Sequence, residues 1–172
     1  MQFNHYGGQS ARLAAALVNA PWPLTPDQLE PILAEHEIIR RRLTTEQIAG
    51  LHAWSRRLAR CFGDQDIDER CAAINGLLAD ASSSPRITTH DGQAPHLHYS
   101  APGSDAAAHI RATTAAGLAS VVCFAAPHRL GRCARCGRAY VDTSRNGRRS
   151  YCTVRCANND AVARHRSARA AV

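Results

Sequence analysis

The sequence predicts an α+β protein with a mostly helical N-terminal domain, one small β-hairpin and a C-terminal module that holds four cysteines and ends in a basic helix. Three observations predict this organisation. Capped segments with helical spacing of apolar residues fill most of residues 1–127. The pattern alternates around residues 86–100. Two close cysteine pairs occupy residues 133–156. With 172 residues, we expect one compact domain (1–127) and a small module (128–172).

Local signals place the first helices. A short helix is expected from Ser10 to Asn19, before the Pro-Trp-Pro turn at residues 21–23. Thr25 with Gln28, and Thr44 with Gln47, have the spacing of capping boxes and predict the starts of two further helices. The inner face predicted behind the second box consists of Ile48, Leu51, Ser55, Leu58 and Phe62.

Two more helices complete the predicted domain. One begins at Asp66, with an inner face of Ile67, Cys71, Ile74 and Leu78. The other is capped by Ser104 and runs from Asp105 to about Ala126, with its apolar stripe at Ile110, Thr114, Leu118, Val121 and Ala125. No apolar run reaches the roughly 18 residues needed to cross a bilayer, so we expect no membrane partner.

A hairpin is predicted where residues 86–90 and 96–100 flank Asp91-Gly92. His96 and His98 alternate along one strand and therefore share a face, with His90 across the hairpin. We interpret this as a polar strand face. A second metal site is the alternative, but no cysteine or carboxylate completes a recognisable ligand spacing. His96, His98 and Asn19 are candidate ligand-binding residues, although Asn19 would equally serve as a helix C-cap.

Four cysteines have the spacing of a structural zinc site: Cys133-x2-Cys136, then Cys152-x3-Cys156. Four thiolate ligands leave no open position, so the zinc would be structural. Disulfides are the alternative, but the N-terminus lacks an export signal and seven cysteines cannot all pair, which favours a reducing cytoplasm. The other three cysteines are expected to be small core residues, at positions 61, 71 and 123.

The module between and after the cysteine pairs is expected to be zinc-ribbon-like. Residues 138–142 predict a strand, residues 144–147 a turn and residues 148–151 the return strand. A helix is expected from Ala157 to Ala170.

The positive charge belongs to this module. All 21 basic residues are arginine. Residues 1–127 carry 10 Arg against 12 Asp and Glu, whereas residues 128–172 carry 11 Arg against 2 Asp. A small, strongly basic module beside a near-neutral domain is typical of nucleic-acid-binding proteins.

These residues resemble the CGNR zinc-finger family of bacterial transcription regulators. The resemblance is carried by the cysteine spacing and by the segments at residues 140–146, 148–152 and 156–159. The tetrapeptide Cys-Gly-Asn-Arg that names the family is Cys-Ala-Asn-Asn here, at residues 156–159. Leu17-Val18-Asn19 is similar to the signature of the ABATE domain, which precedes this finger in the family. That resemblance implies a domain that senses a small ligand.

We therefore expect DNA as the partner, a small-molecule effector, and a homodimer, because DNA readers commonly pair on symmetric sites. No catalytic constellation is recognisable, so we expect no enzyme. The candidate DNA contacts are Arg145, Arg148, Arg149, Asn158, Arg164, Arg166 and Arg169. The alternatives are a solvated hairpin tip for the first three, a helix cap for Asn158, and a protein-interaction or RNA-binding module.

Overall fold

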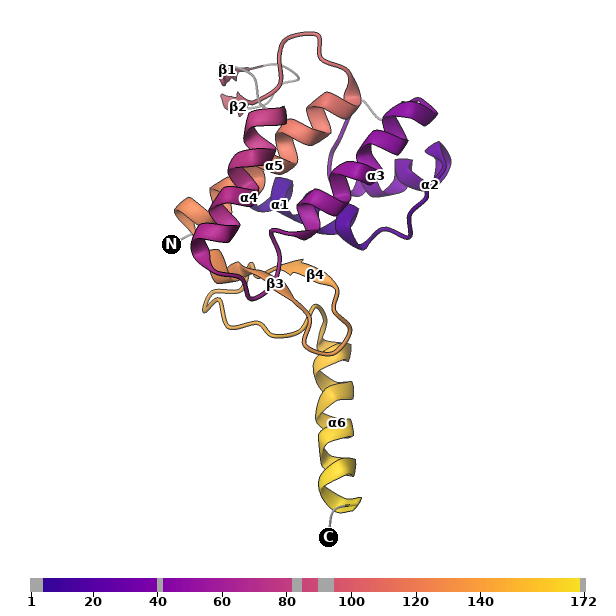
Figure 1. Cartoon of the computed structure of the whole chain (residues 1–172), viewed down its shortest axis with the longest axis vertical. Coiled ribbons are helices and arrows are strands. Elements are labelled where there is room, and N and C mark those ends of the chain that lie inside the picture. The colour runs from indigo at the N-terminus through magenta and orange to yellow at the C-terminus, as the bar shows by residue number, and fades with distance from the viewer. Residues whose placement is uncertain (1–4, 40–41, 82–84, 90–94, 171–172) are drawn as a thin grey trace.

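The computed structural model describes residues 5–39, 42–81, 85–89 and 95–170 (Figure 1). Its helices are α1 (His5–Asn19), α2 (Pro26–Glu35), α3 (Thr45–Ala59), α4 (Ile67–Ala81), α5 (Ala106–Phe124) and α6 (Val154–Ala170), with a short 3-10 helix η2 (Pro127–Arg129). The strands are β1 (Arg86–Thr88), β2 (His96–His98), β3 (Leu130–Arg132) and β4 (Ala139–Val141). The predicted α+β class with a helical bulk is confirmed.

Helix α5 is the central element of the helical bundle formed by α1 to α5. It packs against α1, α3 and α4, and ten of its residues are buried. Gly117 allows the closest approach, since a Cβ at this position would lie 2.6 Å from the Ala11 backbone nitrogen of α1. Tight backbone contact of this kind requires glycine. Leu13, Leu17, Leu51 and Leu118 are among the fully buried side chains of this core.

Helix α5 is also long and apolar enough, by length and composition, to cross a membrane, which the sequence analysis did not anticipate. Half of that apolar stretch is buried inside the bundle. Such burial is typical of the core helix of a soluble protein, and nothing else in the described residues has this membrane-like character.

Both predicted capping boxes form. The Thr44 N–H donates to Gln47 Oε1 (2.8 Å), and the Gln47 N–H donates to Thr44 Oγ1 (3.2 Å). Thr25 and Gln28 begin α2 in the same way. Capping depends on residues three apart in the sequence, so the sequence alone predicts it correctly.

Two predictions about the helices were wrong. Helix α4 buries Arg70, Ile74 and Leu77, whereas Ile67 is exposed, so its inner face is rotated from the predicted one. Helix α5 is capped by Asp105, whose side chain accepts from the Ala108 N–H (2.7 Å), and not by Ser104. Ser104 and Asp105 are adjacent residues that can both cap a helix, whereas an apolar pattern gives no signal that the charged Arg70 is buried on α4.

The return strand predicted at residues 148–151 does not form. Strand β4 pairs instead with β3, which precedes the first cysteine pair, in the register Gly131↔Tyr140. The turn between them is the Cys133–Gly137 segment itself. On its opposite edge, β4 is occupied by Asn19: the side-chain amide donates to the Ala139 carbonyl oxygen (2.8 Å) and accepts from the Ala139 N–H (2.9 Å). The backbone of β4 therefore has hydrogen-bond partners on both edges, β3 on one side and the Asn19 amide on the other.

Several contacts attach β3 and β4 to the helical bundle. Leu130, Ala139 and Val141 belong to the same hydrophobic core as the helices. Arg132 donates to the Ala59 carbonyl oxygen (2.8 Å) and to that of Phe62 (3.2 Å), at the end of α3. Buried Arg70 donates to the carbonyl oxygens of Pro127 and Gly63. Helix α6, in contrast, extends away from the rest of the molecule (Figure 1). The expected boundary at residue 127 stays a prediction.

Replacement of Gly117 by alanine should destabilise the bundle. The added Cβ would meet backbone atoms of α1 at 2.6 Å, so the helices must separate, at a cost of about 3 kcal/mol in the free energy of unfolding. Gly50→Ala is the control, because its new Cβ meets only the Arg111 side-chain tip at 3.8 Å and helix propensity should add up to about 1 kcal/mol. Equilibrium denaturation that ranks the two variants equally would contradict this packing.

Asn19→Ala should also lower stability, by about 2 kcal/mol, since it removes two hydrogen bonds and leaves the Ala139 backbone groups unsatisfied. Asn159→Ala, at an exposed position of α6, should change the free energy of unfolding by less than about 0.5 kcal/mol. Equilibrium denaturation measures both. Equal stabilities of the two variants would exclude this role for the Asn19 amide.

Candidate metal centre

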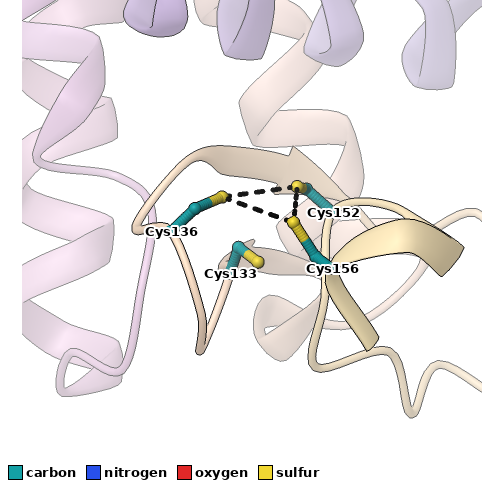
Figure 2. Close-up of side chains that lie close together, drawn as sticks. All are labelled: Cys133, Cys136, Cys152 and Cys156. Carbon is teal, nitrogen blue, oxygen red and sulfur yellow. Dashed lines mark hydrogen bonds between the residues drawn. The ribbon is translucent and has the colours of Figure 1, made fainter. Parts of the chain in front are cut away.

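Four cysteine sulfurs converge at the base of α6 (Figure 2). The sulfurs of Cys133, Cys136, Cys152 and Cys156 all lie within 4.8 Å of one another. The Sγ–Sγ distances are 3.6 Å for Cys136–Cys152, 3.7 Å for Cys152–Cys156 and 3.8 Å for Cys156–Cys136. The structure thus brings together all four predicted ligands.

These separations fit one tetrahedral zinc ion. With Zn–S bonds of about 2.3 Å, tetrahedral angles place neighbouring sulfurs about 3.8 Å apart. A disulfide requires sulfurs about 2.05 Å apart, and every cysteine is a free thiol. The donor set is therefore suited to one soft or borderline cation. Because four protein ligands complete its coordination, such an ion would be structural.

The first cysteine pair lies on a tight turn between β3 and β4. The Gly137 N–H donates to the Cys133 carbonyl oxygen (2.9 Å), and the Cys133 N–H donates to that of Arg138 (2.9 Å). Gly137 has φ of +71°, which favours glycine. Arg132 also donates to the Gly137 carbonyl oxygen (3.1 Å), so the turn is tied to the end of α3 through the same guanidinium group.

The second pair lies at the start of α6. Thr153 Oγ1 accepts from the Cys156 N–H (3.1 Å), as an N-cap side chain does. Cys156 consequently lies in the first turn of the helix. The helix begins three residues earlier than the sequence predicted, and it includes this ligand.

The thiols oppose one another's ionisation. Burial disfavours the Cys133 thiolate, but backbone N–H groups, foremost that of Cys152, outweigh it and lower the pKa of that thiol to about 6. Burial and then the neighbouring sulfurs raise the pKa of Cys152 to about 12. One thiolate is thus favoured while another is suppressed, and a divalent cation would stabilise all four in the ionised form.

The remaining cysteines differ from the sequence-based expectation in one case. Cys61 is buried, and burial raises the pKa of its thiol to about 11. Cys71 is half-buried. Cys123 is exposed, so its prediction as a core residue was wrong: it lies near the end of α5 beside exposed Phe124, whereas Val121 and Ala125 of the same segment pack on the core.

A preorganised loop at residues 142–149 replaces the predicted hairpin tip. Buried Asp142 accepts from the Ser144 N–H (2.8 Å) with one carboxylate oxygen and from the Arg149 N–H (2.8 Å) with the other. Burial opposes ionisation, but these hydrogen bonds leave the pKa of Asp142 below its usual value. Arg129 reinforces the loop by donating to the carbonyl oxygens of Asp142 (2.9 Å) and Ser144 (2.7 Å).

The candidate DNA contacts lie in two places. Arg145, Arg148 and Arg149 are exposed around a concavity of about 570 Å³ on the loop. The other four are exposed along α6: Asn158, Arg164, Arg166 and Arg169. Asn158 lies within the helix, past the N-cap at Thr153, so the structure does not support its alternative role as the cap.

Side chains beside the metal centre orient the start of α6. Tyr151 donates from its hydroxyl to Asp160 Oδ2 (2.7 Å), and Arg164 Nε lies 3.0 Å from the same oxygen. Ala157 and Asn159, which depart from the family tetrapeptide, both lie in the first turns of this helix. Sequence reasoning missed Asp160, Asp142, Arg129 and Arg132, because each acts through backbone or side-chain partners that only the fold brings close.

The structure does not bring Asn19 near the other two ligand-binding candidates. Asn19 lies against β4, and both ends of its amide bind the Ala139 backbone. His96 and His98 lie on β2, at the opposite end of the molecule from β3 and β4 (Figure 1). His90 lies outside the described residues.

Cys152→Ser should abolish tight zinc binding, because it removes one of four ligands and leaves an open coordination position. Chelator-resistant zinc, measured by elemental analysis of purified protein, should fall from one equivalent to near zero. Cys123→Ser is the matched control and should retain the metal, since its sulfur is exposed on α5. Retention of a full equivalent by the Cys152 variant would contradict the four-cysteine assignment.

The comparisons agree with this geometry. No curated protein matches the chain. Residues 129–169, about a quarter of the sequence, match the model of the CGNR zinc finger family. This match confirms the predicted resemblance to the family, and the matched residues include all four cysteines whose sulfurs converge at the base of α6.

Proposed function

We propose that this protein is a zinc-dependent, DNA-binding transcription regulator of the cytoplasm. The observation that carries the proposal is the position of the basic residues. Of the 21 arginines, 11 belong to residues 128–172, against only 2 acidic residues. The seven candidate contacts are all exposed. Exposed arginines on a small metal-supported module match the electrostatic requirements of phosphate recognition.

Helix α6 supports a groove-binding role. It has 17 residues and extends away from the bundle (Figure 1), and side chains 163–169 are all exposed. Val154 and Val162 are 72% and 49% exposed, so no core covers the helix. An isolated helix of this length is only marginally stable in water. An α-helix fits the width of the DNA major groove, where its arginines would meet both phosphates and base edges.

The loop at residues 142–149 supports backbone contact. Its shape is set by Asp142 and Arg129, so its three exposed arginines would bind phosphate with little loss of conformational freedom. The loop is bound to β4 by Tyr140, which donates to the Arg149 carbonyl oxygen, and β4 follows the turn that carries the first cysteine pair. Helix α6 carries Cys156 of the metal centre. Zinc would therefore hold both surfaces in one arrangement.

The helical bundle is assigned the sensory and dimerising role that the ABATE resemblance implies, with a small-molecule effector and a homodimer as proposals. Because β3 and β4 share a core with the bundle, a change in its packing would be transmitted to the loop that carries the arginines. The proposal includes no catalytic step. The competing function is RNA binding or protein interaction. Binding measurements with DNA and RNA probes distinguish it from DNA binding.

DNA affinity should fall steeply with salt and depend on individual arginines. Arg145→Ala and Arg166→Ala should each weaken binding to duplex DNA several-fold and reduce the magnitude of the slope of log K against log salt by about 1. Fluorescence anisotropy with mixed-sequence duplexes at several salt concentrations measures both. Arg56→Ala, exposed on α3, is the control and should leave affinity and slope unchanged.

Salt-independent binding, or equal losses in the Arg56 variant, would overturn the proposal. A single-stranded RNA probe of the same length distinguishes the competing function. If RNA binds more tightly than duplex DNA at every salt concentration, the module is an RNA binder. If neither nucleic acid binds to zinc-loaded protein, a protein partner becomes the better account.

A further inference from the structure

The β1–β2 hairpin has its polar and apolar faces reversed. Ile87 and Leu97 are paired directly across the two strands, yet they are 71% and 52% exposed. His96 and His98, on the other face of β2, are half-buried. A strand next to a core normally turns its apolar residues inward. Where a structure departs from such a rule, the inward polar residues are expected to be functional. The polar strand face that the sequence predicted is therefore the half-buried face.

His96 and His98 have the separation of two ligands to one metal ion. Their Nε2 atoms are 3.0 Å apart, and their ring centres are 4.9 Å apart. With Zn–N bonds of about 2.05 Å, ligand nitrogens lie about 2.9 Å apart at a right angle and about 3.3 Å apart at a tetrahedral angle. The ring centres of two such imidazoles lie about 5 Å apart. Both measured distances fall in this range.

A third imidazole comes from α5. The ring centre of His109 lies 5.8 Å from that of His98. The Nδ1 atom of His109 lies 3.2 Å from the hydroxyl of buried Ser100. In the tautomer in which Nδ1 carries the proton and donates this hydrogen bond, Nε2 is the nitrogen that can bind a metal. Histidines that bind metals usually have their second nitrogen held in this way by a neighbouring polar group.

The His109 ring must turn to complete the set. Within the described parts of the chain, only the four cysteines bring three or more ligand atoms within 4.8 Å of one another. The two strand histidines thus have the separation of two ligands, whereas a ring nitrogen of His109 would have to move closer to join them. Their Nε2 atoms are close enough to share a hydrogen bond, and a metal ion would replace the shared proton.

We propose that His96, His98 and His109 form a second metal site, separate from the zinc finger, for a divalent transition ion that prefers imidazole, such as Zn²⁺ or Ni²⁺. Three neutral imidazoles leave at least one coordination position for water or an exchangeable ligand. Unlike the cysteine site, this site would therefore bind its ion reversibly. It joins a hairpin to the central helix of the bundle, and it does not depend on DNA binding.

The test is a calorimetric titration of Ni²⁺ into untagged full-length protein whose cysteine site is already loaded with zinc. Ni²⁺ favours imidazole ligands and is poorly suited to a tetrahedral thiolate site that already holds zinc. The wild-type chain should bind one equivalent. His96→Gln and His98→Gln should each weaken binding at least tenfold, and His109→Gln should weaken it to a smaller extent. His165→Gln is the control, since this histidine is exposed on α6.

Zinc content and circular dichroism of each variant show whether the finger and the fold are intact. If a glutamine variant misfolds, NMR of the wild-type protein still decides the question, since the imidazole signals of these three histidines should shift together on addition of Zn²⁺. No nickel binding by the wild type, unchanged affinity in both strand variants, or an equal loss in the His165 variant would overturn the proposal. DNA affinity is measured separately, so failure of either proposal leaves the other intact.

Discussion

Four thiol groups packed this closely cannot all ionise unless a cation neutralises them, and the C-terminal region depends on that interaction. The pKa of Cys133 is lowered and that of Cys152 is raised. Without a cation, the cluster therefore favours a thiolate at Cys133 and a protonated thiol at Cys152. A divalent ion would remove this difference and would link the turn after β3 to the first turn of α6. Without that link, α6 would be connected to the strands mainly through an irregular loop.

A second constraint decides where this centre lies. Strand β4 has one edge paired with β3 and the other bound by the Asn19 amide, and its apolar residues enter the core of the bundle. Arg132 and Arg70 add hydrogen bonds to the ends of neighbouring helical segments. The metal centre therefore stands on a base continuous with α1 and α3, while α6 projects from it (Figure 1). The strands beside the arginine-bearing loop thus share one hydrophobic core with the bundle.

Local interactions explain which predictions were correct. The capping boxes at Thr25 and Thr44, the pairing of residues 86–88 with 96–98 within the predicted hairpin, and the convergence of the four cysteines follow from residues close in sequence, and they were predicted correctly. The return strand at residues 148–151 was wrong because the edge it needed is taken by Asn19, 120 residues away from Ala139. The inner face of α4 was misplaced because buried Arg70 is stabilised by carbonyl groups of Gly63 and Pro127.

The sequence by itself determined the metal-ligand set and the distribution of charge, because the spacing of cysteines and the count of arginines do not depend on distant contacts. The positions of the other functional groups were decided only by the tertiary structure. Asp142 shapes the arginine loop through hydrogen bonds to Ser144 and Arg149, and the hairpin turns its histidines toward α5 instead of solvent. Alternation along a strand defines two faces but does not say which is buried. That choice is made by the packing of the whole chain.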